Sequence, residues 1–149
     1  MLGQLITSFI AAAGFGVLFN APKRSLLHCG WIGMLGWILY YWLSAYQHVD
    51  EVPSTLAAAF LVGVLSQHCA RVFKTPIIIF DVSGIIPLVP GGLAYDAMRN
   101  FVENEYNIAL QLAAKAFLIS GAIAIGLVFS EVINQLIRRR MRKASLFLK

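Results

Sequence analysis

The chain has 149 residues, of which 59% are hydrophobic and 13% are charged, with a formal net charge of +5. A soluble domain carries about 25% charged residues and could not bury so much apolar surface at this length. The composition argues against disordered chains, coiled coils and nucleic-acid-binding domains. It predicts an all-α integral membrane protein that forms a single domain over residues 1–149.

About five segments are long and apolar enough to cross a membrane, which takes about 20 residues each. In chain order they are expected over residues 2–19, 26–46, 56–73, 77–97 and 113–137, followed by a basic tail over residues 138–149. No Lys or Arg precedes the first segment, so it lacks the basic start of a signal peptide and is expected to remain as a helix. Small residues at helical spacing, such as Ala122 and Gly126, predict close helix packing.

The charges between these segments alternate in sign. Lys23 and Arg24 follow the first segment, Asp50 and Glu51 follow the second, and Arg71 and Lys74 close the third. The stretch 96–105 after the fourth segment is mixed and partly acidic, and the tail is rich in arginine. Because basic loops stay in the cytoplasm, we predict a multi-pass plasma-membrane protein with its N-terminus outside and its C-terminus in the cytoplasm.

The fourth segment contains two prolines and two glycines, at Pro87, Pro90, Gly91 and Gly92. Such residues break a helix, so this segment is either a broken crossing or a re-entrant loop. A re-entrant loop would put the arginine-rich tail outside, against the charge pattern, and we therefore predict a broken crossing.

The break is also the predicted substrate site. Backbone groups freed inside a membrane must face protein or a wet cavity, and the N-terminus of a half-helix at Gly91 and Gly92 can bind an anion. We therefore expect Pro87, Pro90, Gly91 and Gly92 to bind a substrate carboxylate, together with Asp81 on the cytoplasmic side of the break. A kink that serves packing alone is the alternative.

A second group of polar residues is expected in the inner third of the membrane. Gln67 and His68 precede Arg71 by four and three residues, so the three are expected on one helix face, and Glu131 lies at similar depth in the last segment. We expect these four residues to act in gating, and Arg71 to form an ion pair with Asp81. Side chains that reach the interface, together with a purely structural ion pair, are the alternative.

Nothing in the sequence predicts an enzyme. There is no HExxH or GxSxG motif, the three histidines are scattered, and Cys29 and Cys69 are isolated thiols in apolar runs. We therefore expect no catalytic residues, no metal site and no cofactor.

Three stretches carry a resemblance to a known family: residues 19–24, residues 66–71 with Pro76 after them, and residues 84–95 with the run Ile-Pro-Leu-Val-Pro-Gly. The chain resembles the threonine/serine exporter family, and within it the small, YjjB-like half. The resemblance implies an inner-membrane exporter of small amino acids or, in some two-chain members, of dicarboxylates such as succinate. It also implies a larger integral-membrane subunit of the same family as partner.

The sequence is therefore consistent with two functions. The first is a subunit of a two-component secondary exporter for small carboxylate metabolites. The alternative is an accessory membrane subunit that assembles or stabilises a partner without touching substrate. In either case we expect a complex with a second membrane protein or, failing that, a homo-oligomer, and no nucleic-acid partner.

Overall fold

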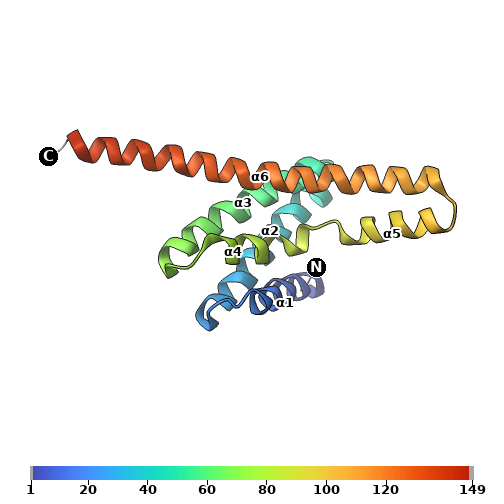
Figure 1. The fold of residues 1–149 in the computed structure, drawn as a ribbon, viewed down its shortest axis with the longest axis horizontal. Coiled ribbons are helices and arrows are strands. Elements are labelled where there is room, and N and C mark those ends of the chain that lie inside the picture. Colours follow the sequence, from blue (N-terminus) through green and yellow to red (C-terminus); the bar gives the residue numbers. More distant parts are fainter. Residues whose placement is uncertain (1, 148–149) are drawn as a thin grey trace.

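The computed structural model describes the backbone of residues 2–147 and the side chains of residues 3–138, and every element in this part is helical. The elements are α1 (Leu2–Leu18), α2 (Lys23–Tyr46), α3 (Glu51–Phe73), α4 (Ile77–Ile85), the short 3-10 turn η1 (Ile86–Leu88), α5 (Gly91–Val102) and α6 (Tyr106–Phe147). The all-α prediction is confirmed (Figure 1).

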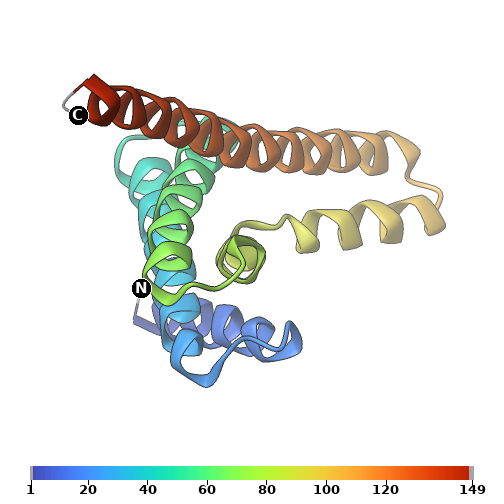
Figure 2. The same ribbon diagram turned by 60° about the vertical axis from the view of Figure 1, so that its left-hand side comes forward.

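Helices α1 to α4 form a bundle, and α6 runs along one side of it (Figure 1). Helix α3 packs against both α2 and α6, while α4 lies against α2 and α3. Helix α5 and the first part of α6 form a hairpin that stands away from this bundle, as Figure 2 shows.

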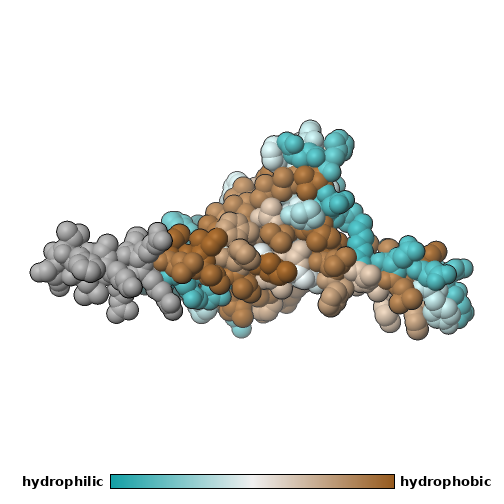
Figure 3. Space-filling view, turned by 90° about the horizontal axis from the view of Figure 1, so that it is seen from above, coloured by the Kyte–Doolittle hydropathy of each residue, from teal (hydrophilic) through white to brown (hydrophobic). Residues whose placement is uncertain are grey.

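The surface is that of a membrane protein. Large apolar side chains face outward along the helices: Leu18 is 73% exposed and Phe117 is 79% exposed. In Figure 3 the visible face is mostly hydrophobic over the middle of the molecule, and hydrophilic residues gather toward its protruding ends. Such a surface is favourable only when lipid or another protein covers it.

Three helices are long and apolar enough to cross a membrane by themselves: Lys23–Tyr46, Glu51–Phe73 and Tyr106–Arg138. A fourth crossing is available if Ile77–Leu88 and Gly91–Val102 count as one span, bent by 55°. Helix α1 is apolar but shorter than these. The expected number of about five crossings is therefore approximate, and the break in the fourth segment is confirmed.

The position of the break follows from local chemistry. Val89 is extended, with φ −66° and ψ 128°, and it precedes Pro90, from which α5 begins. A residue before proline is pushed out of the helical region, and proline has no N–H to continue the hydrogen-bond ladder. The chain therefore leaves one helix at Val89 and starts the next at Gly91.

The predicted boundaries of the last two helices need correction. The sequence predicted that the fourth segment ends near residue 97 and the fifth begins near residue 113, with a long connection between them. In the structure α5 continues to Val102 and α6 already begins at Tyr106. The turn is tight because Asn104 adopts a left-handed backbone with φ 65°. At about 1.5 Å per residue, α6 is about 63 Å long, which exceeds the hydrocarbon core of a bilayer. Most of the basic tail lies outside the described side chains.

Small residues bring α3 and α6 into close contact. A Cβ atom added to Gly126 would lie 2.7 Å from the carbonyl oxygen of Leu56 and 3.0 Å from the Cβ of Ala59. A Cβ atom on Gly63 would collide with the side chain of Ser130. A side chain at Gly126 would meet backbone atoms and push the helices apart, and one at Gly63 would displace Ser130. This contact fixes the polar end of α6 beside the polar end of α3.

Candidate functional site

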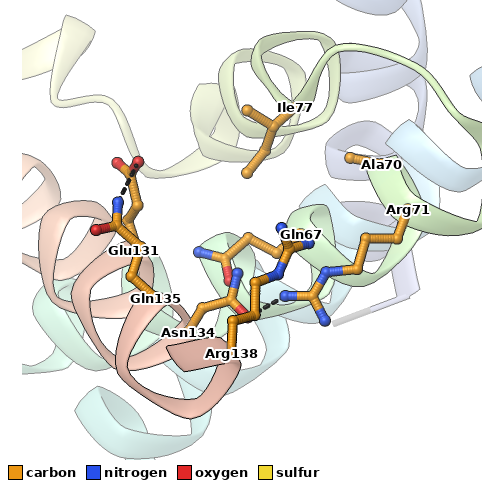
Figure 4. A pocket seen from close by; sticks show the side chains of 8 residues that line it. All are labelled: Gln67, Ala70, Arg71, Ile77, Glu131, Asn134, Gln135 and Arg138. Atoms are coloured by element: carbon orange, nitrogen blue, oxygen red, sulfur yellow. Dashed lines mark hydrogen bonds between the residues drawn. The ribbon is translucent and has the colours of Figure 1, made fainter. Parts of the chain in front are cut away.

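A polar cavity of about 360 Å³ lies where α3 ends, α4 begins and α6 passes both; we call it the inner cavity. Its lining residues are Gln67, Ala70, Arg71, Ile77, Glu131, Asn134, Gln135 and Arg138 (Figure 4). The volume falls at the lower end of the range of about 300–1,000 Å³ that is typical of small-molecule sites.

The turn after α3 shapes one wall of this cavity. Lys74 takes a left-handed backbone with φ 51°, and its N–H and that of Thr75 both donate to the carbonyl oxygen of Ala70. This arrangement caps the last turn of α3 at the carbonyl of Ala70, and Pro76 then starts α4 without needing an N–H partner. The reversal places Ile77 opposite Ala70 and Arg71.

Two side-chain hydrogen bonds join α3 to α6 beside the cavity. Gln67 Nε2 donates to Ser130 Oγ at 3.2 Å, and Ser130 itself donates to the carbonyl oxygen of Leu127 at 2.8 Å. One turn further along both helices, Arg71 donates to the Oδ1 atom of Asn134. The two pairs repeat at a spacing of four residues on each helix. One face of α3 is therefore hydrogen-bonded to one face of α6 along two successive turns.

The cavity contains charges of both signs. Arg71 and Arg138 provide guanidinium groups, and Glu131 provides a carboxylate whose Oε1 accepts a hydrogen bond from Gln135 Nε2 at 3.1 Å. Among the described side chains, no ion pair links Glu131 to either arginine. The arginines can therefore bind an anionic group, and Glu131 can accept from a cationic one.

Three of the four residues expected in gating come together here. Gln67, Arg71 and Glu131 line the inner cavity, but His68 is exposed and lies outside its lining. Neighbouring residues on an α-helix point about 100° apart, so His68 cannot share the face of Gln67. The sequence reasoning also missed Gln135 and Arg138, although their spacing of four and seven residues from Glu131 marks one helix face.

The expected ion pair between Arg71 and Asp81 is wrong. Arg71 binds Asn134 instead, and Asp81 Oδ1 is buried without a hydrogen-bond partner in the described part of the chain. The hydroxyl of Ser66, which is fully buried, likewise has no hydrogen-bond partner among the described residues. The prediction failed because it paired residues that are near in sequence, whereas α6 offers a closer partner.

The broken helix borders a second cavity of about 300 Å³, here called the outer cavity. It is lined by Trp37, Tyr40, Glu51, Thr55, Pro87, Leu88, Val89, Pro90, Gly92, Leu93 and Ile119. Three of the residues predicted to bind substrate are thus on its wall, while Gly91 and Asp81 are not part of the lining. Its polar features include an ion pair of 2.7 Å between Glu51 and Lys115, and the buried Nε1 atom of Trp37, which has no partner among the described residues.

A sequence model of a protein family, described as "Threonine/Serine exporter, ThrE", matches residues 4–133. The chain belongs to this exporter family. The match includes all residues that line the outer cavity and the residues of α3 and α4 that line the inner cavity. On α6 it includes Glu131 but ends before Asn134, Gln135 and Arg138. No solved structure matches the chain.

Membership of the exporter family identifies the chain as a multi-pass membrane protein of the threonine/serine exporter type. This agrees with the resemblance carried by the sequence motifs. It also gives the two cavities a context, because transporters bind their substrates between helices and beside broken spans.

Proposed function

We propose that the chain is the small subunit of a two-component secondary exporter in the plasma membrane. Its substrates are small carboxylate metabolites, either threonine- and serine-type amino acids or dicarboxylates such as succinate. The observation that supports this most strongly is the inner cavity, where Arg71 and Arg138 reach one small space between helices of an exporter-family protein. Guanidinium groups bind carboxylates through paired, charge-assisted hydrogen bonds.

The two cavities suggest a route through the protein. Thr55 in the outer cavity and Gln67 in the inner cavity are twelve residues apart on α3, or about 18 Å at the rise of an α-helix. The loop charges put the inner cavity on the cytoplasmic side. In this proposal, substrate enters at the inner cavity and leaves past the Pro87–Gly92 break, where the N-terminus of α5 favours a carboxylate.

Exposed charged and apolar side chains support the proposal of a partner subunit. Arg71, Glu131 and Arg138 are exposed, although they lie at the ends of membrane helices. A charged side chain facing lipid costs about 2.5–3.5 kcal/mol at the bilayer centre and less toward the interface. Helix α5 is covered on one side by α6 and exposes Tyr95, Met98 and Val102. A larger membrane subunit of the same family would cover both regions, and a second copy of the chain is the alternative.

Export from vesicles tests this proposal. Vesicles that contain this chain together with a larger family member should export threonine or succinate, and vesicles with either protein alone should not. Export by the purified monomer would contradict the two-component arrangement. If Arg71→Gln left the rate of the complex unchanged, the chain would be an accessory subunit that does not touch substrate.

The orientation has its own test. Reporter fusions after Arg24 and Lys74 should read as cytoplasmic, and fusions after Glu51 and Glu105 as external. A fusion after Lys143 that read as external would contradict the proposed route.

A further inference from the structure

Glu131 is the single acidic residue in the lining of the inner cavity, and it lies apart from the two arginines. Figure 4 shows Glu131 and Gln135 together on one side of the cavity, while Arg71 reaches across from α3 and ends at Asn134 instead of at Glu131. The amide of Gln135 orients the carboxylate but does not neutralise it. The cavity therefore has a positive part and a negative part with space between them.

The other acidic residues near the two cavities are not available in the same way. Glu51 of the outer cavity is already paired with Lys115 at 2.7 Å. Asp81 lines neither cavity. Of these three acidic residues, Glu131 alone lines a cavity without being paired to a cation. It is exposed, and its hydrogen-bond partner is the uncharged amide of Gln135.

We infer that Glu131 determines the substrate class of this exporter by accepting the α-ammonium group of an amino acid whose carboxylate binds Arg71 and Arg138. This inference rests on the proposed function. A dicarboxylate would satisfy the arginines equally well, but its second carboxylate would be repelled by Glu131. Selection then comes from a repulsive contact with one substrate class as well as an attractive contact with the other.

The test compares threonine and succinate in vesicles that contain the two-chain complex. Glu131→Gln keeps the shape and the contact with Gln135 but removes the charge. Because the variant loses a hydrogen bond between two charged groups, the KM for threonine should rise about tenfold to a hundredfold. Succinate, a weak competitor of the wild type, should become a better competitor of the variant. Glu105→Gln, which removes an acid outside both cavities, should change neither value.

A second readout separates this inference from the proposed function. Threonine should raise the unfolding temperature of the purified wild-type complex more than succinate does, and Glu131→Gln should reverse that order. If the order reverses but no vesicle exports either compound, the site assignment holds and the export function fails. If Glu131→Gln weakens threonine and succinate equally, or changes neither in both assays, Glu131 does not select the substrate.

Discussion

Replacing Gly126 by alanine tests the contact that holds α6 against α3. The added Cβ atom would lie 2.7 Å from the carbonyl oxygen of Leu56 and 3.0 Å from the backbone nitrogen of Phe60. Both are backbone atoms inside a helix, so they cannot turn away as a side chain can. The helices must therefore separate by several tenths of an ångström, which loosens the hydrogen bonds that cross to Gln67 and Arg71.

The size of the effect can be isolated with a matched control on the same helix. A Cβ atom added to Gly121 meets nothing within 4 Å, so Gly121→Ala changes only helix propensity, which favours alanine by about 1 kcal/mol. Gly126→Ala gains the same propensity but adds the collision, and overpacking of this kind costs about 1–3 kcal/mol. The two variants should therefore differ by about 1–3 kcal/mol, with Gly126→Ala the less stable.

Thermal unfolding of the purified protein in detergent measures this difference. For proteins of about this size, each kcal/mol corresponds to about 2–4 °C, so Gly126→Ala should melt several degrees below Gly121→Ala. Equal melting temperatures would refute the close contact between α3 and α6. The position of Asn134 opposite Arg71 would then lose its support.

Two further predictions concern the residues around the break. Gly92 lines the outer cavity and Gly91 does not, and neither would bring a Cβ atom within 4 Å of another atom. Gly92→Val should therefore leave abundance and partner assembly normal but reduce export more than Gly91→Val does; loss of assembly would favour a kink that serves packing alone. Asp81→Asn should lower abundance or export, and exchanging Arg71 with Asp81 should not restore either, because Arg71 binds Asn134. Normal export by Asp81→Asn would remove Asp81 from the mechanism, and rescue by the exchange would restore the rejected ion pair.

Local features of the sequence predicted the fold class and the break correctly. Helix length and apolar content depend on neighbouring residues, and the effect of Pro90 on Val89 acts across one peptide bond. The shared face of Gln67 and Arg71 also follows from helical spacing alone. These are properties that a chain displays before its helices are packed together.

The sequence alone did not predict which side chain each polar group would contact across the helix packing. Arg71 lies ten residues from Asp81 but sixty-three residues from Asn134, and only the packing of α6 on α3 decides between them. The same holds for the cavity wall formed by Gln135 and Arg138. The end of α5 was placed too early because polar residues such as Asp96 and Arg99 suggested a loop, although they belong to a helix with an apolar face.

Protection of an introduced cysteine by substrate tests most directly whether the inner cavity receives substrate. Ala70→Cys places a thiol on the cavity wall, in a background with Cys29→Ala and Cys69→Ala, and Lys23→Cys, which is exposed at the start of α2 and lines neither cavity, serves as the control. In vesicles of the two-chain complex, a membrane-impermeant thiol reagent should label the Ala70→Cys variant from the cytoplasmic side, and threonine should slow that labelling. The control should show no protection by threonine. Failure of the Ala70→Cys variant to label, or labelling at the same rate with and without threonine, would contradict the assignment of the inner cavity as the site of substrate entry.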